Sequence, residues 1–423
     1  MKIRRISLVM VIAVALVLMM SGMAMAEASV GSTAISNELN ATFQVEGLEK
    51  GVVAEEFTVV NRSDINLKGY SVGLKLVNAT SADLNEITVE LYSGDKLLVT
   101  NTSTGLISSL GSQVQYTSPF NIFAEYDGYV EGYWTTGEWA GSKLVVPTKA
   151  VITVTYMDGT VATAMNSNLT GDLNSIMPNV DVTPGPFAVA SNDDQNYYGY
   201  AVDFSLVEAK PIDVDAIEVK LVSSDGTVLI TNTANSKFLT ELSDVDHTSP
   251  FNVFGDFADG NYTEEYWDLG AWNRAVSHLV VPAKAVITVT FVNGEVVVAE
   301  NNNLTGDSAS IVPDELITLS WDYSDGQTVA VDEEFSVSVT ATSDYVIDNV
   351  LFIVEINDVN GSGFTAVGTD NQNLGYDEDG GFWFWGPSGG FTFNSEDPVT
   401  STFDITTIPG AELQVKVYAV QLP

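Results

Sequence analysis

The chain has 423 residues, with 56 Asp and Glu against 16 Lys and Arg, and its formal net charge is −40 at pH 7. A surface this acidic repels nucleic acid and anionic lipid, and it attracts cations. The chain contains no cysteine, so disulfides, zinc–thiolate sites and a cysteine nucleophile are excluded. This length suits about three domains, each large enough to bury a core.

Residues 1–26 are predicted to be a secretory signal peptide. Lys2, Arg4 and Arg5 precede an apolar stretch, and Ala24-Met25-Ala26 matches a small-residue cleavage site. Loss of the three basic residues changes the net charge from −40 to −43. A retained anchor is the alternative, but no later stretch approaches the roughly 18 apolar residues of a spanning helix. We therefore expect an extracellular mature chain without a membrane span.

Two segments, residues 45–178 and 183–312, are predicted to be copies of one domain. Four landmarks recur: "GY" at Gly69 and Gly199, "TSPFN" at Thr117 and Thr248, "LVVPxKAVITVT" at Leu144 and Leu279, and "NLTGD" at Asn168 and Asn303. Residues 27–44 form an N-terminal segment before the copies. The Pro- and Gly-containing residues 179–187 are predicted to be a short, stiff linker. Residues 313–423 lack the landmarks and form a third domain.

The local pattern is that of β-strands. Along residues 150–156 and 285–291, apolar side chains alternate with Val and Thr, which gives the two-residue period of a strand with one buried face. Asp-Gly and Asn-Gly follow these strands as hairpin turns. Only short pieces such as residues 271–277 could be helical. We predict an all-β protein, with tandem duplicated β-sandwich-like domains followed by a third, immunoglobulin-like β-sandwich.

Carboxylates and aromatic residues gather in residues 125–139, which raises the hypothesis of a glycosidase. Such enzymes use two carboxylates about 5–10 Å apart. Glu131 has Glu264 as its counterpart in the second copy, but Glu138 is replaced there by Ala271. A two-carboxylate site is therefore not kept in both copies.

The two histidines also give no catalytic pattern. His247 lies in a predicted turn, and His278, whose counterpart is Lys143, is expected at a surface or strand end. Neither belongs to a metal-binding His pair or a nucleophile elbow. We therefore predict that the protein is not an enzyme and assign no catalytic residues.

Two tryptophans recur at fixed spacing in both copies, as Trp134 and Trp139 and as Trp267 and Trp272. Large aromatic side chains at matched positions favour core or inter-domain anchors. The alternative is a sugar-binding platform, which would make the protein a cell-surface adhesin or carbohydrate-binding protein.

Acidic loops are candidates for structural calcium, the only cofactor considered. The best is the cluster Asp377, Glu378 and Asp379, because Ca²⁺ is bound by several oxygen ligands from such loops. None of the loops has full EF-hand spacing, so solvated turns are the alternative.

Eight N-x-S/T sequons make glycan attachment a second expectation. Asn168 and Asn303 occupy equivalent loops of the two copies. The alternative is that Asn and Thr are merely common in turns and strands. The candidate positions are Asn40, Asn61, Asn78, Asn101, Asn168, Asn261, Asn303 and Asn360.

An aromatic stretch flanked by glycines, "GGFWFWGPSGGFTF", begins at Gly380. It is either a buried plug of the third domain or an exposed protein–protein contact. The glycines favour a partly exposed loop, so Phe382, Trp383, Phe384 and Trp385 are candidate assembly contacts.

The tandem unit with its four landmarks, the Ala-x-Ala signal and the lack of cysteine resembles archaeal cell-envelope proteins. The chain is most similar to the major sheath proteins of filamentous methanogens, with S-layer proteins as the near alternative. This resemblance covers the whole architecture. It implies many copies that assemble through β-strands into stacked rings around the cell, with amyloid-like resistance to detergent and protease. The expected partners are therefore other copies of the chain.

Overall fold

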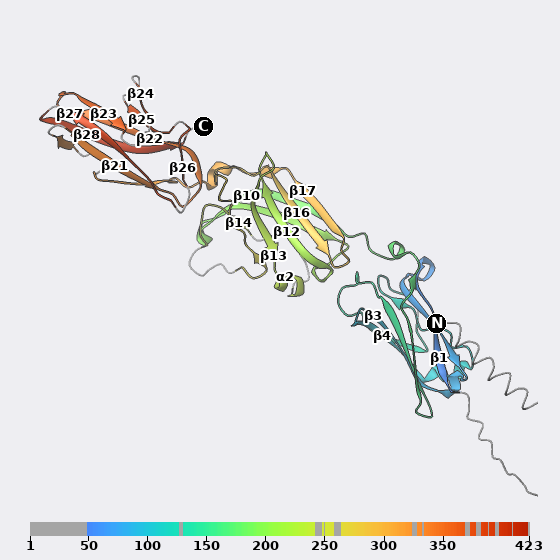
Figure 1. Ribbon diagram of the computed structural model, residues 1–423. Helices are drawn as coiled ribbons and strands as arrows, with labels where there is room; N and C mark the ends of the chain where they lie inside the picture. Colours follow the sequence, from blue (N-terminus) through green and yellow to red (C-terminus); the bar gives the residue numbers. More distant parts are fainter. Residues whose placement is uncertain are drawn as a thin grey trace, which may run out of the picture. The chain divides into compact units, whose positions relative to one another are not determined.

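Six β-sheets form three sandwich-like pairs, which confirms the predicted all-β fold (Figure 1). None of the helices among the described residues has the length and apolarity to cross a membrane. The structure, a computed structural model, describes residues 49–126, 130–241, 248, 250–257, 264–323, 328–331, 334–368, 373–377, 382–387, 389–393, 397–407 and 409–421. The predicted signal peptide and N-terminal segment lie outside this range.

The first repeat is a sandwich of a four-stranded and a five-stranded sheet, with strand orders β5-β2-β1-β9 and β6-β4-β3-β7-β8. Its strands are β1 (Gly51–Arg62), β2 (Leu67–Val77), β3 (Leu84–Ser93), β4 (Lys96–Ser103), β5 (Phe120–Asn121), β6 (Trp134–Thr136), β7 (Lys149–Tyr156), β8 (Val161–Asn166) and β9 (Leu169–Thr170). Short 3₁₀ turns are η1 (Ser63–Ile65), η2 (Ser81–Asp83), η3 (Gly105–Leu110) and η4 (Leu173–Ser175).

The second repeat has the same strand order, β14-β11-β10-β18 against β15-β13-β12-β16-β17. Where the first repeat has η3, the second has the helix α2 (Ser236–Glu241). Residues 271–277, which the sequence allowed to be helical, form no helix and contain a turn at residues 274–275. The strands are β10 (Asp181–Asn192), β11 (Tyr197–Val207), β12 (Val214–Val222), β13 (Val228–Ala234), β14 (Phe251–Asn252), β15 (Trp267–Asp268), β16 (Lys284–Phe291), β17 (Val296–Asn301) and β18 (Leu304–Thr305), with 3₁₀ turns η5 (Asp193–Gln195), η6 (Pro211–Asp213) and η7 (Ser308–Ile311).

The predicted linker is a strand. β10 begins at Asp181 and passes through Pro184 and Pro186, and the β10–β11 register shifts between Pro184 and Phe187. β1 has a matching shift between Ala54 and Phe57 without any proline. Prolines are tolerated at such bulges because the ladder is already interrupted there. The prolines therefore mark a bulge inside a domain, and the linker prediction was wrong.

The repeated phrase forms an inner strand of each five-stranded sheet. In β7 and β16, buried and half-buried residues alternate along the strand, as the two-residue period predicted. The buried set in β7 is Ala150, Ile152, Val154 and Tyr156, all at most 1% exposed. Because both neighbours of each strand are hydrogen-bonded to it, this phrase carries the centre of each core.

The recurring "GY" has a steric cause. A Cβ on Gly69 would lie 1.7 Å from the Phe120 carbonyl oxygen, and one on Gly199 would lie 1.8 Å from the Phe251 oxygen. The next residue in each copy is a core tyrosine, and burial raises the pKa of Tyr200 to about 12. Glycine is required there because the β2–β5 and β11–β14 backbones approach too closely for a side chain.

The third sandwich has sheets ordered β19-β21-β27-β23 and β20-β28-β22-β25-β24, with β26 paired to β22. Its core includes Val339, Phe352, Ile405 and Leu413. The strands are β19 (Thr318–Trp321), β20 (Thr328–Val331), β21 (Glu334–Thr342), β22 (Ile347–Asp358), β23 (Phe364–Gly368), β24 (Asn373–Asp377), β25 (Phe382–Gly386), β26 (Phe391–Phe393), β27 (Val399–Thr407) and β28 (Ala411–Gln421).

Replacement of Gly69 by alanine tests the close approach of β2 and β5. We expect Gly69→Ala to lower the free energy of unfolding of the first repeat by about 1–3 kcal/mol, because the new Cβ overlaps a backbone oxygen. Denaturant titration followed by tryptophan fluorescence measures this. Gly105→Ala is the matched control, since no atom lies within 4 Å of its Cβ position, and it should change stability by no more than about 0.5 kcal/mol. Equal effects of the two changes would refute the steric explanation.

Candidate functional site

The two repeats end their five-stranded sheets with equivalent edge strands, β8 and β17. At six residues each, they are the longest edge strands in the described part of the chain. The other edges of both repeats, β5, β6, β9, β14, β15 and β18, have only two or three residues. Short edges limit unwanted strand pairing, so β8 and β17 are the places where this protection is missing.

The edge strands also lack the charges that usually protect an edge. β8 contains no charged residue, and its outward-facing Val161 and Met165 are 63% and 61% exposed. In β17 the outward-facing Val296 and Val298 are each 57% exposed. The one charge in β17, on Glu300, is paired with Lys284, with 2.8 Å between Nζ and Oε1. Apolar side chains and unpaired backbone groups therefore coincide on both edges.

The apolar surface extends onto the neighbouring strand. In the first repeat Met165 pairs with Val151 and Val161 pairs with Thr155, which gives an outer face of Val, Thr and Met two strands wide. β16 and β17 repeat this arrangement with Thr288 opposite Val298. Another chain can approach this face without placing carboxylate opposite carboxylate, which would be unfavourable.

A side-chain hydrogen bond fixes the end of each edge strand. Asn166 donates its side-chain N–H to the Glu55 carbonyl oxygen, and Asn301 donates to the Gly185 oxygen at 2.6 Å. Both acceptors lie in the bulges of β1 and β10. The bulge turns a backbone carbonyl toward the opposite sheet, and the asparagine holds the edge strand in position.

The sequons divide into accessible and inaccessible positions. Asn168 and Asn303 are exposed and follow β8 and β17 directly, and Asn61, Asn78 and Asn360 are also exposed. Asn40 and Asn261 lie outside the described residues.

Asn101, one of the predicted glycan-attachment positions, is not accessible, because it is only 1% exposed. Its side chain donates to the Ser118 oxygen at 2.9 Å and accepts from the Gly137 N–H at 3.2 Å. Asn232, its counterpart, accepts from the Gly270 N–H at 3.0 Å. This asparagine is a structural link in both copies, and a glycan at Asn101 is incompatible with the fold.

The recurring tryptophans are packed inside the sandwiches. Trp134, Trp267 and Trp272 are 6–7% exposed, and the half-buried Trp139 stacks on Tyr70 with ring centroids 6.2 Å apart. The indole N–H groups of Trp139 and Trp272 donate to backbone oxygens of Ser142 and Val276. Buried rings cannot offer a face to a sugar, so the geometry corresponds to core anchors.

The carboxylates beside the tryptophans hold the backbone. Glu131 accepts from the Tyr133 N–H at 2.9 Å, and Glu264 accepts from the N–H groups of Tyr266 and Trp267 at 2.8 and 2.9 Å. Of the other three carboxylates in residues 125–139, Glu125 and Glu138 are exposed, and Asp127 lies outside the described residues. The glutamate that both copies share therefore stabilises its loop by accepting backbone hydrogen bonds in each copy.

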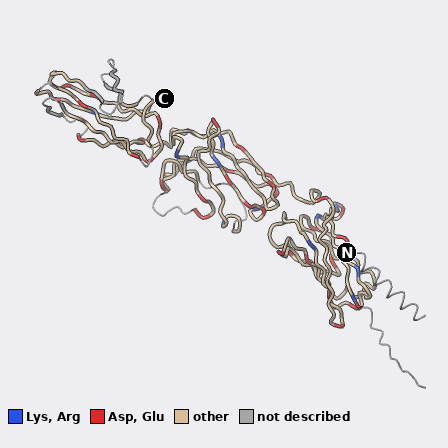
Figure 2. Tube along the Cα trace, viewed as in Figure 1, with Lys and Arg blue, Asp and Glu red and all other residues tan. Residues whose placement is uncertain are grey.

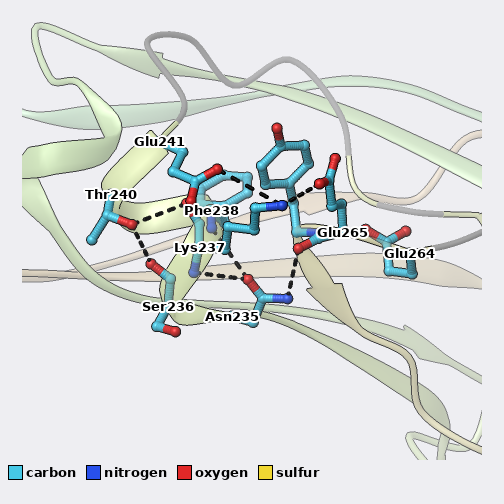
Figure 3. Close-up of polar contacts among 9 residues, drawn as sticks. Asn235, Ser236, Lys237, Phe238, Thr240, Glu241, Glu264 and Glu265 are labelled. Carbon is cyan, nitrogen blue, oxygen red and sulfur yellow. Dashed lines mark hydrogen bonds and ion pairs between the residues drawn. The ribbon is translucent and has the colours of Figure 1, made fainter.

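In the second repeat a further polar cluster joins α2 to this loop (Figure 3). Asn235 accepts from the N–H groups of Lys237 and Phe238 at 3.0 and 3.2 Å and donates to the Glu265 oxygen at 3.1 Å. The Lys237 ammonium binds Glu265 and Glu241, and the hydrogen bond to Glu265 raises the pKa of Lys237 above its usual value. In the first repeat the N-cap of η3 is Thr104, whose side chain makes no capping hydrogen bond. The Asn235 cap therefore favours a helix in the second copy.

The structure describes only the backbone of the aromatic stretch, and little of the candidate calcium cluster. Phe382 to Trp385 form β25, hydrogen-bonded between β22 and β24, so the predicted aromatic loop is a strand. The side chains of residues 382–385 lie outside the described set, as do those of Asp377, Glu378 and Asp379. Among the described residues, no three acidic or His side chains are grouped to hold a metal ion.

His278 lies at a junction between domains, whereas the sequence pattern placed it at a surface or strand end. Its backbone N–H donates to the Val346 oxygen at 2.9 Å, and its Nδ1 accepts from the Val346 N–H at 2.9 Å. The ring stacks on Trp272 at 5.4 Å and packs against Phe254 and Tyr345. Burial lowers the pKa of His278 to about 4. His247 lies outside the described residues.

Comparison with known proteins gives weak structural likenesses only. No family model matches the chain, and no curated protein matches it. The biofilm-associated protein BSP domain is similar over 88% of this chain and 63% of its own, with 11% identity and a TM-score of 0.18. A membrane-anchored protein from Corynebacterium diphtheriae is similar over 88% and 96%, with 9% identity and a TM-score of 0.15. TM-scores this low do not establish a shared fold or function.

The junction should be sensitive to acid through His278. Because its folded pKa is about 4 and its usual value is 6.5, the unfolded chain takes up the proton first. The stability contributed by neutral His278 is therefore present above about pH 6.5 and is lost as the pH falls toward 4. Thermal unfolding at pH 7 and pH 4.5 should show a larger loss of Tm for the wild type than for His278→Gln, which cannot titrate. Identical losses would show that His278 does not control the junction.

Proposed function

We propose that the protein is an extracellular structural protein whose copies associate through β8 and β17 into a sheath or surface layer around the cell. The observation that carries this proposal is the pair of equivalent edge strands, which are long and largely apolar and contain a single charged residue, Glu300 in β17. A strand of another copy that adds to such an edge satisfies its unpaired N–H and C=O groups and covers its exposed Val and Met side chains.

Duplication suits repetitive assembly. One chain presents two edges of the same length and strand order, so each copy can contact two neighbours through similar surfaces. Two contacts per copy are the minimum for a ring or a linear filament, and head-to-tail contacts close or extend according to their rotation.

Repulsion between the negatively charged copies sets the conditions under which their edge strands can pair. Copies with a net charge of −40 repel one another, and this repulsion is screened over about 8 Å at physiological salt. Association should therefore need salt or divalent cations. The edge faces are suited to contact because they have little charge of their own.

The signal sequence and the resemblance to archaeal sheath proteins support an extracellular location and a role as a building block. A sheath and an S-layer differ in assembly geometry, which electron microscopy distinguishes as tubes of stacked rings or flat lattices. An adhesin that uses the tryptophan pairs has less support, because three of the four indole rings are buried.

The edges are tested by placing a charge on each. In residues 27–423, Thr163→Lys with Val298→Lys should reduce assembly at least about tenfold, since two lysines must be desolvated for strands to pair. Electron microscopy and sedimentation velocity at high protein concentration, with and without calcium, measure this. The matched control is Met157→Lys with Val292→Lys, which changes exposed apolar residues in the adjacent hairpin turns.

Ordered rings, sheets or tubes that disappear only in the edge variant would support the proposal. Equal assembly of edge variant and control would remove β8 and β17 from the contact. A wild-type chain that stays monomeric in all these conditions would contradict the structural role itself.

A further inference from the structure

An open cleft lies where the first repeat meets the second. It has a volume of about 660 Å³, and residues of both repeats line it. Ser142 Oγ donates to Asp213 Oδ1 across this junction at 2.7 Å, and Leu144 packs into the core of the second repeat. A cleft of this size is typical of sites for small ligands.

The cleft concentrates free positive charge. Lys68, Lys143 and Lys210 line it, and all three are exposed. In the described part of the chain only six lysines lack an ion pair, and the other three are Lys75, Lys96 and Lys416. Half of the unpaired lysines therefore face one cleft, although acidic residues are spread along all three sandwiches (Figure 2).

The two carboxylates of the cleft are engaged with other groups. Asp213 accepts from the Lys210 backbone N–H at 2.9 Å as well as from Ser142. Glu208 accepts from the Asn179 N–H at 2.9 Å. Both carboxylates accept hydrogen bonds from backbone N–H groups. Neither forms an ion pair with the three ammonium groups.

The second junction carries different residues at the same positions. The counterparts of Lys68 and Lys143 are Tyr198 and His278. There the His278 ring packs among Phe254, Trp272 and Tyr345, and Tyr345 donates its hydroxyl to the Phe254 oxygen at 2.6 Å. Aromatic rings close one junction, whereas lysines leave the other open.

We propose that the cleft between the repeats binds an acidic oligosaccharide whose sugar residues carry carboxylates. Ammonium groups from both repeats form charge-assisted hydrogen bonds with the carboxylates. Phe123, Pro178 and Ile212 offer apolar contact to the ring C–H faces. At physiological salt, charges beyond about 8 Å are screened, so the nearby lysines outweigh the distant acidic surface.

A saccharide suits the cleft better than a protein partner does. A stable protein contact buries about 800 Å² on each side, whereas a cleft of about 660 Å³ has the volume typical of a small-ligand site. A short chain of uronic acids supplies several carboxylates and several apolar ring faces within a small volume. The site does not depend on self-assembly, since it lies within one copy of the chain.

Calorimetric titration of dilute residues 27–423 with trigalacturonic acid tests the proposal. We expect binding that weakens as salt rises, and no binding of the fully methyl-esterified trisaccharide, which has the same rings without charge. Lys68→Tyr with Lys143→His should raise the Kd about tenfold or more. These substitutions import the residues that the second repeat already carries at the equivalent positions.

Lys75→Tyr with Lys416→His is the matched control, because it removes two exposed lysines that form no ion pair and do not line the cleft. It should leave the Kd unchanged. Lys210→Gln gives an independent single change in the cleft and should also weaken binding, whether or not the double variant folds. The proposal is overturned by no binding, by equal binding of the ester, or by equal effects of cleft and control variants. Tighter binding of triglutamate than of trigalacturonate would overturn the saccharide assignment in favour of an acidic peptide.

Discussion

The antiparallel ladder between β3 and β7, repeated between β12 and β16, supports each duplicated sandwich. Its inward residues, such as Ile152 and Ile287, are fully buried, and hydrophobic burial is the dominant favourable contribution to folding. With no cysteine in the chain, no disulfide supplements this layer. The inward positions of the ladder therefore stay apolar in both copies, and its β7 and β16 strands recur almost letter for letter.

A sandwich of this kind leaves sheet edges unpaired, and in this protein the edge strands differ in length. Most edges in the repeats are cut to two or three residues, whereas β8 and β17 keep six. Shortening an edge reduces the backbone groups available to another chain. The same edge is long in both copies and lies beside an otherwise acidic surface. This arrangement fits the contact that we propose between copies.

The two copies differ where each meets the next domain. Trp139 and Trp272 each brace the loop that precedes the repeated phrase. The loop then offers Lys143 in one copy and His278 in the other. Duplication thus preserved the bracing interaction and changed the residue that it presents, which gives one open, cationic junction and one closed, aromatic junction.

The sequence alone determined the all-β fold, the duplication and the buried face of β7 and β16, because strand alternation is a local property with a period of two. It misplaced the β10 segment, since Pro184 and Pro186 indicate a linker unless the bulge is known. Tertiary structure decided that Asn101 is buried, that Glu131 caps a loop and that His278 fills a junction. It also decided which strands are edges and which lysines share a cleft, because both depend on contacts between residues far apart in the chain.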